Sequence, residues 1–155
     1  MAQISFQDVS IPLTGIYEGR KSAGRMYGSG RKGVILSNMN TNEQNEWEPL
    51  VDPLVSKGYL VLTYNYIDPH SDQSGVLADV LTFVKQAGAD TVLLLGASRG
   101  GVTSMQVAAR PDLTGGLIGV TAISAPVDHQ GELFFSRDDL ARVRVPKLLI
   151  NTEHD

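Results

Sequence analysis

The most constraining feature of this sequence is a series of short, fully apolar runs separated by longer amphipathic stretches. Runs that are apolar at every position are typical of strands buried on both faces, as in parallel sheets covered by helices. Stretches that are apolar on one face only predict the covering helices. The sequence therefore predicts an α/β fold, with a mostly parallel sheet and helices on both faces. The predicted strands are 33–36, 59–64, 91–95, 117–123 and 147–151, and the predicted helices are 47–57, 73–86, one ending near residue 110, and a short one at 138–142.

The first 32 residues follow a different pattern. Residues 3–12 partly alternate between apolar and polar side chains, which predicts a half-exposed edge strand. Residues 15–32 hold several glycines and predict a turn-rich segment with room for a second short strand. No repeat, low-complexity stretch or linker divides the sequence, so we expect a single domain over residues 1–155.

Composition argues against several classes of function. The net charge is −4, which gives no support to binding of nucleic acid or of an anionic membrane, because both favour a basic patch. The sequence has no cysteine and no His/Asp/Glu cluster at metal-ligand spacing, so we expect neither a metal nor a cofactor. The N-terminus lacks the basic and apolar regions of a signal peptide, and the apolar runs are too short to cross a bilayer. The expected location is the cytoplasm.

The chemistry-bearing motif is a G-x-S-x-G pattern, which reads Gly96-Ala97-Ser98-Arg99-Gly100. It lies between a predicted buried strand and a predicted helix, the context in which this pattern forms a nucleophile elbow. The sharp turn lifts the serine hydroxyl above the sheet, and a Cβ on either flanking glycine would clash. The following helix directs its free N–H groups at the site, so the backbone N–H of Arg99 is a candidate oxyanion donor. The alternative is a glycine-rich turn in which Ser98 only caps the helix.

At these residues the sequence resembles the α/β-hydrolase family, from about residue 33 to the end. The resemblance implies a serine hydrolase with Ser98 as its nucleophile. In that family the strand before the first long helix ends in a His-Gly-x signature whose backbone supplies a second oxyanion donor. The matching positions here are Ser37, Asn38 and Met39, so the signature is not preserved. The backbone N–H of Met39 is the candidate for the second donor.

The resemblance also implies the place of the catalytic acid. Residues 143–155 resemble the family's penultimate strand, which begins near a proline and is followed by the catalytic aspartate. Asp155 fits the position of this acid. The family's histidine follows the acid, whereas His70, His129 and His154 all precede Asp155. We therefore expect a shortened chain that lacks the last strand and helix of the domain and has little or no turnover. His129 is a distant candidate for a substitute base.

The same expectation bears on partners and substrates. A last apolar strand without a neighbour would be an exposed sheet edge, so we expect self-association through it. Residues 124–144 are too few for a cap domain, which favours an open site for small esters, lactones or short acyl groups. Uncapped carboxylesterases and the dienelactone-hydrolase group, which uses cysteine in place of Ser98, are the nearest relatives by this measure. Arg99 is unusual after the nucleophile; we expect it to fold over the helix surface, and the alternative is that it attracts an acidic substrate.

Two other functions stay open at this point. The glycines of the motif also resemble those of short-chain dehydrogenases, which bind a dinucleotide. In those enzymes the motif follows the first strand, its third glycine would fall at Val102, and the required Tyr-x-x-x-Lys pair matches only Tyr17 and Lys21, which precede the glycines. A non-catalytic binding protein of the α/β-hydrolase fold is the other alternative. The lost His-Gly signature favours it, and the intact elbow at Ser98 opposes it.

Overall fold

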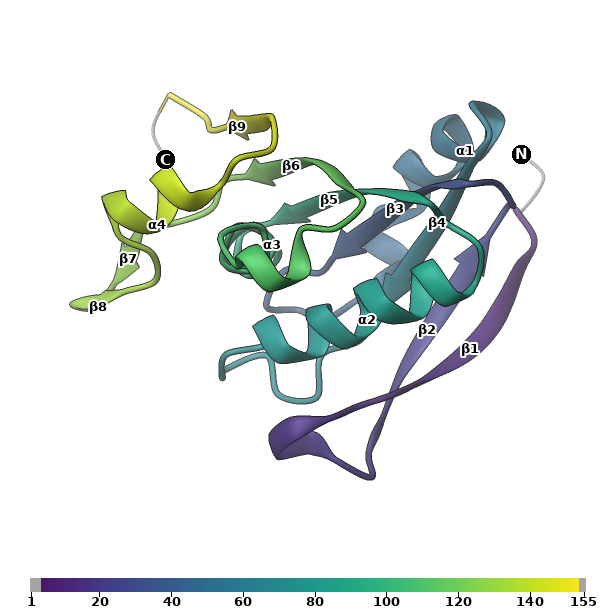
Figure 1. The fold of residues 1–155 in the computed structure, drawn as a ribbon, viewed down its shortest axis with the longest axis horizontal. Helices are drawn as coiled ribbons and strands as arrows, with labels where there is room; N and C mark the ends of the chain where they lie inside the picture. Colours follow the sequence, from purple (N-terminus) through teal and green to yellow (C-terminus); the bar gives the residue numbers. More distant parts are fainter. Residues whose placement is uncertain (1–3, 154–155) are drawn as a thin grey trace.

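The centre of the protein, seen in a computed structural model that describes residues 4–153, is a seven-stranded sheet (Figure 1). Its strands in chain order are β1 (Phe6–Pro12), β2 (Lys21–Tyr27), β3 (Lys32–Ser37), β4 (Tyr59–Tyr64), β5 (Thr91–Ala97), β6 (Leu117–Ile123) and β9 (Lys147–Ile150). Their order in space is β1-β2-β4-β3-β5-β6-β9. The strands from β4 to β9 in this order are parallel, while β2 pairs antiparallel with both β1 and β4. The predicted mostly parallel α/β sheet is confirmed.

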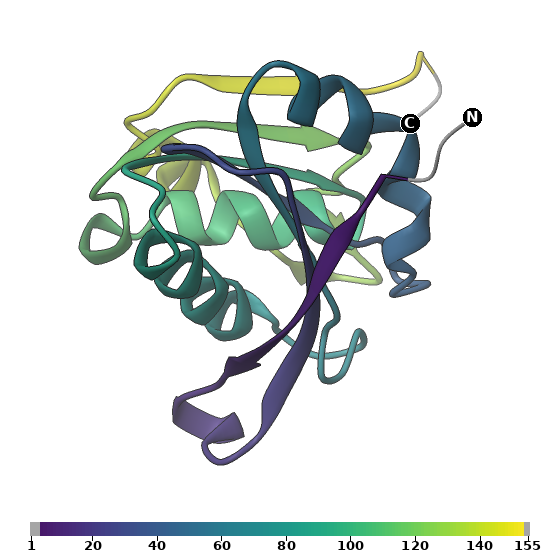
Figure 2. The same cartoon turned by 90° about the vertical axis from the view of Figure 1, so that its right-hand side faces the viewer.

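Helices cover both faces of this sheet (Figure 2). The main helices are α1 (Glu48–Ser56), α2 (Ser74–Gln86) and α3 (Arg99–Ala108), and a short α4 (Arg137–Arg142) precedes β9. Successive side chains of a strand point to opposite faces, and β3 shows the consequence. Ile35 packs into the cluster formed with α2 and α3, whereas Val34 and Leu36 pack into a second cluster with α1. The continuous apolar run of β3 is therefore buried on both sides.

The N-terminal part differs from the sequence-based expectation in one respect. Strand β1 forms the predicted edge of the sheet, but β2 is a full seven-residue strand rather than a short one. Gly24 lies inside β2 rather than in a turn. A Cβ at this position would come 2.9 Å from the carbonyl oxygen of Thr63 on β4, so a larger residue would not fit there. The glycine thus permits close strand pairing rather than a turn.

The segment between β6 and β9 holds a small hairpin that the sequence did not predict. Strands β7 (Asp128–His129) and β8 (Glu132–Leu133) pair antiparallel across Gln130 and Gly131. Both turn residues have positive φ angles, 51° and 83°, as a tight two-residue hairpin turn requires. No cap domain is inserted in this segment; the hairpin and the predicted short helix α4 fill it.

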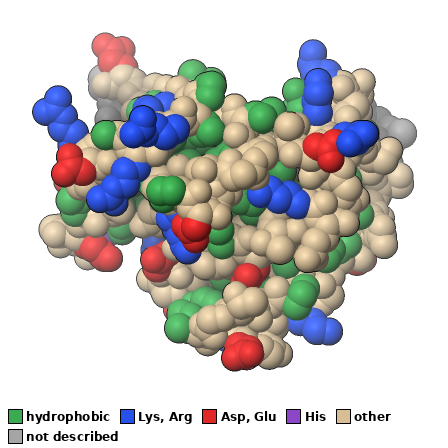
Figure 3. All heavy atoms as spheres, viewed as in Figure 1, with side chains coloured by type: hydrophobic (Ala, Val, Ile, Leu, Met, Phe, Trp, Pro, Cys, Tyr) green, Lys and Arg blue, Asp and Glu red, His purple; other side chains and the backbone are tan. Residues whose placement is uncertain are grey.

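The surface carries mixed charge on the face shown in Figure 3, where Lys and Arg side chains are interspersed with Asp and Glu. Between residues 4 and 153, no helix has both the length and the apolar character needed to cross a membrane.

Candidate functional site

The turn between β5 and α3 holds Ser98 in a rare backbone conformation. Its φ and ψ angles are 50° and −116°, a combination that costs a non-glycine residue about 1–3 kcal/mol and persists only where the surroundings impose it. The surroundings are hydrogen bonds at both ends of the residue. The N–H of Ser98 donates to the carbonyl of Ile123 on β6 at 2.8 Å, and its carbonyl accepts from the N–H of Val102 on α3 at 3.1 Å.

The two glycines of the motif have no room for a side chain. A Cβ on Gly96 would overlap the carbonyl group of Gly100, and a Cβ on Gly100 would overlap the carbonyl group of Ser37 at the end of β3. The elbow therefore packs directly on the strand end that leads to Asn38 and Met39. The motif requires glycine at both positions because the backbone approaches each of them too closely for a side chain.

The hydroxyl of Ser98 does not cap α3, although Ser98 occupies the N-cap position. Within residues 4–153 it makes no hydrogen bond, and Ser98 lines a pocket of about 210 Å³. As at any helix start, the first N–H groups of α3, beginning with that of Arg99, have no acceptor within the helix. The alternative interpretation of Ser98 as a cap is not what the structure shows. The pocket is lined by Asn40, Ser98, Arg99, Val102, Pro126, His129 and Phe134.

One side of this pocket begins at the end of β3, where Asn38 is completely buried. Its side-chain amide donates to the carbonyl of Tyr64 at 2.7 Å and to Oδ1 of Asn42 at 3.2 Å, and its Oδ1 accepts from Nε1 of Trp47 at 3.0 Å. Its backbone carbonyl accepts from the hydroxyl of Tyr66 at 2.6 Å. Every polar group of this side chain has a partner, which fixes the chain just before Met39. We call these five residues the Asn38 network.

Burial keeps the two tyrosines of this network neutral. It raises the pKa of the Tyr64 hydroxyl, which also hydrogen-bonds to Ser37 Oγ at 2.9 Å, far above its ordinary value. Burial likewise raises the pKa of Tyr66, with a further contribution from the neighbouring Tyr64. Both hydroxyls therefore keep their protons at any ordinary pH, and that of Tyr66 remains the donor to the carbonyl of Asn38. Sequence reasoning missed the network; the only local signal is that its tyrosines and asparagines lie at or just beyond the carboxyl ends of β3 and β4.

Met39, the predicted second oxyanion donor, is half-buried, and its carbonyl accepts from the N–H of Asn42 at 3.0 Å. The residue of this loop that lines the pocket is its neighbour Asn40. The structure thus places the loop beside Ser98, with Asn40 rather than Met39 in the pocket wall.

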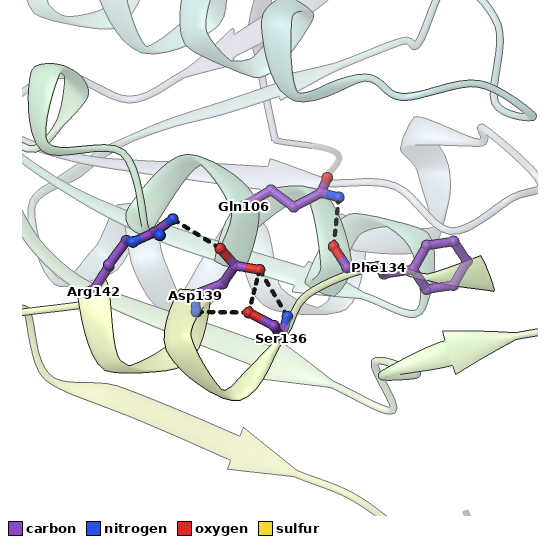
Figure 4. A network of polar contacts seen from close by, with 5 residues as sticks. All are labelled: Gln106, Phe134, Ser136, Asp139 and Arg142. Atoms are coloured by element: carbon purple, nitrogen blue, oxygen red, sulfur yellow. Dashed lines mark hydrogen bonds and ion pairs between the residues drawn. The ribbon is translucent and has the colours of Figure 1, made fainter. Parts of the chain in front are cut away.

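The opposite side of the pocket comes from the segment between β6 and α4. The side chain of Gln106 on α3 donates to the carbonyl of Phe134 at 3.1 Å (Figure 4). Beyond it, Ser136 begins α4 with reciprocal hydrogen bonds to Asp139, and Arg142 pairs with the same carboxylate at 3.1 Å. The hydrogen bonds from Ser136 lower the pKa of Asp139. The contact with Gln106 holds Phe134, which lines the pocket.

The predicted triad partners are distributed unevenly. His129 lies on β7 and lines the pocket together with Ser98, but within the described residues no hydrogen bond joins the two. His70 is exposed in the loop after β4 and does not line the pocket. His154 and Asp155, the predicted acid, lie outside the described residues. Strand β9 runs parallel to β6, as the prediction for the acid-bearing strand requires.

Arg99 lies elsewhere than the favoured sequence interpretation placed it. Its side chain lines the pocket beside Ser98 instead of folding over the helix surface. The guanidinium carbon is 5.7 Å from the centre of the Phe134 ring, a cation–π contact that joins the start of α3 to the opposite side of the pocket.

Comparisons with known proteins detect similarity only in three dimensions. No protein-family model matches the sequence, and no curated protein is significantly similar to it. An esterase from Pyrococcus furiosus superposes with a TM-score of 0.68 at 18% identity in one crystal form, over 80% of this chain and 50% of that one. In a second crystal form the TM-score is 0.74 at 15% identity, over 94% of this chain and 70% of the esterase.

One bacterial and one archaeal hydrolase give similar TM-scores and identities. A protein described as a dienelactone hydrolase from Klebsiella pneumoniae has a TM-score of 0.68 at 14% identity, over 97% of this chain and 85% of that one. A protein described as a CIB-like hydrolase from Thermoplasma acidophilum has a TM-score of 0.67 at 19% identity, over 95% and 73%. Compared with the first esterase structure, this chain spans half the length. At such identities the likeness establishes the architecture and no activity: the chain has the α/β-hydrolase fold.

Proposed function

We propose that this protein is a serine hydrolase for small esters or related acyl substrates, with Ser98 as nucleophile. The observation that carries the proposal is the strained backbone of Ser98, which lines a pocket, combined with a hydroxyl that serves no structural hydrogen bond within residues 4–153. Strain of this kind is costly to keep, and it occurs preferentially at functional sites. A serine that only shaped a turn would need neither feature.

In the proposed reaction Oγ of Ser98 attacks the carbonyl carbon of an ester. The bond to the alcohol breaks, the serine proton passes to the leaving alcohol, and water then releases the acid from the acyl-enzyme. The backbone N–H of Arg99 would donate to the developing oxyanion, helped by the positive end of the α3 dipole. The loop at Met39 would supply the second donor. Asp155 is proposed as the acid that orients a catalytic histidine.

The size of the pocket supports a small substrate. Its volume of about 210 Å³ lies below the roughly 300–1,000 Å³ typical of sites for drug-sized ligands. The hairpin and α4 between β6 and β9 leave it without a cap domain. The neighbours that carry the names esterase and dienelactone hydrolase are in keeping with this substrate class.

We further propose that the 155-residue chain turns over slowly. A serine hydroxyl needs a base within hydrogen-bond reach, and His129, the histidine that lines the pocket, does not hydrogen-bond to Ser98. Residual catalysis from an oxyanion hole alone amounts to about 10³–10⁴ over water in hydrolases whose triad has been disabled. Such a level is measurable with an activated ester.

The test is the hydrolysis of 4-nitrophenyl acetate and butyrate by the wild-type chain and by Ser98→Ala, with and without added imidazole as an external base. The rate of imidazole alone is subtracted. We expect slow hydrolysis by both proteins without imidazole, and an acceleration by imidazole in the wild type that Ser98→Ala lacks. Equal rates for wild type and Ser98→Ala in both conditions would overturn the proposal.

A non-catalytic binding protein is the second candidate, because Ser37, Asn38 and Met39 stand where hydrolases carry His-Gly-x. In that case ligands would bind in the pocket without an acyl group appearing on Ser98. Intact mass after incubation with a 4-nitrophenyl ester separates the two candidates, since only a hydrolase accumulates the acyl adduct.

A further inference from the structure

Among the described residues, one Lys or Arg side chain lines the Ser98 pocket, and it has no carboxylate partner there. This residue is Arg99. Within residues 4–153, no carboxylate oxygen of Asp or Glu lies within 4 Å of its guanidinium nitrogens. By contrast, Arg31, Arg110 and Arg142 each pair with an aspartate. The half-buried Arg99 contacts the Phe134 ring, and within residues 4–153 its guanidinium N–H groups have no hydrogen-bond acceptor.

Among the described residues that line the pocket, the others carry no negative charge that would neutralise Arg99. Val102, Pro126 and Phe134 are apolar, and Asn40 is a neutral amide. The acidic residues of the neighbouring hairpin, Asp128 and Glu132, are exposed and do not line the pocket. A guanidinium with free donors in a partly apolar pocket is best satisfied by a carboxylate, which it can bind through two parallel hydrogen bonds.

We propose that Arg99 binds the free carboxylate of the substrate, and that the site therefore prefers monoesters of short dicarboxylic acids over neutral esters. This inference rests on the proposed function and names its substrate class. We place the bound carboxylate and the ester carbonyl on the same acyl chain, since Arg99 and Ser98 line the same small pocket. A short acyl chain suits a pocket of about 210 Å³, well below the roughly 300–1,000 Å³ of sites for larger ligands.

The experiment compares the 4-nitrophenyl monoester of adipic acid with 4-nitrophenyl hexanoate, which has the same chain length without the carboxylate. The measured quantity is the ratio of kcat/KM for the two esters in the wild type, in Arg99→Gln and in Arg137→Gln. Arg137→Gln is the matched control, because it removes the same charge from an exposed residue outside the pocket. We expect a ratio above one in the wild type, unchanged in Arg137→Gln and lowered about 10- to 100-fold in Arg99→Gln, as for loss of a charged hydrogen bond. A ratio that Arg99→Gln leaves unchanged would overturn the inference.

A binding measurement separates this inference from the proposed function. Adipate is titrated into the single variant Ser98→Ala and into the double variant Ser98→Ala/Arg99→Gln, and the heat of binding is measured by calorimetry. Binding that the second substitution abolishes supports the role of Arg99 even if no ester is hydrolysed. Equal binding to both variants, or binding to neither, contradicts it whatever the outcome of the ester assays.

Discussion

The two sides of the Ser98 pocket are built in opposite ways. The side that follows β3 is the Asn38 network, in which a buried amide, two tyrosines and Trp47 satisfy one another. The side that follows β6 consists of exposed residues from Val127 to Leu133, fastened at Phe134 by the side chain of Gln106. The buried hydrogen bonds of the first side hold it in one arrangement. The exposed residues of the second side make few contacts that would restrict its conformation. A hydrolase requires rigidity where the oxyanion forms and tolerates a looser wall where substrates enter.

The largest effect in this comparison is expected for Asn38→Ala. The substitution leaves the Trp47 indole N–H and the Tyr64 carbonyl buried without partners, which costs about 1–3 kcal/mol for each group. We expect the free energy of unfolding to fall by about 2–5 kcal/mol in urea titration. On the other side of the pocket, His129→Ala should change it by less than about 0.5 kcal/mol, since His129 is exposed. Comparable losses in the two variants would break the contrast.

High pH should weaken the Asn38 network specifically. Burial raises the pKa values of Tyr64 and Tyr66 in the folded state, whereas tyrosines of the unfolded chain ionise near pH 10. Stability is therefore complete below about pH 10 and falls as the pH rises, by up to about 1.4 kcal/mol per pH unit for each tyrosine. Urea titrations at increasing pH should show this slope, and Tyr66→Phe should reduce it. The same slope in wild type and Tyr66→Phe would show that Tyr66 is not held neutral by burial.

The smallest effect concerns the strands beneath the two sides. Strand β3 is buried on both faces, whereas Leu148, Leu149 and Ile150 of β9 are 55%, 54% and 45% exposed at the edge of the described sheet. We propose that copies of the protein associate weakly through this edge. Light scattering should give a mass that rises with concentration for the wild type and stays monomeric for Leu149→Lys. A wild-type mass independent of concentration would contradict the proposal.

The same contrast explains which features the sequence could predict. The strands at β3, β5 and β6 were predictable because each apolar run is local and mostly buried or half-buried. The elbow was predictable because the five residues of its motif, 96–100, are consecutive, although the close approach of Gly100 to Ser37 is long-range. The Asn38 network was not, since Asn38 and Tyr66 are 28 positions apart and meet only when β3 and β4 pair. The prediction that Arg99 folds over the helix surface was wrong for a related reason. The Phe134 ring that Arg99 contacts comes from a loop distant in the sequence.

The central claim is that Ser98 is a nucleophile, and the most direct measurement is intact mass after incubation with a fluorophosphonate probe. The account predicts one adduct on the folded wild-type chain, its complete loss in Ser98→Ala, and its retention in Ser104→Ala, which removes a buried hydroxyl from the same helix. An adduct that persists in Ser98→Ala, or a folded wild-type protein that stays unlabelled with imidazole present as base, would contradict it.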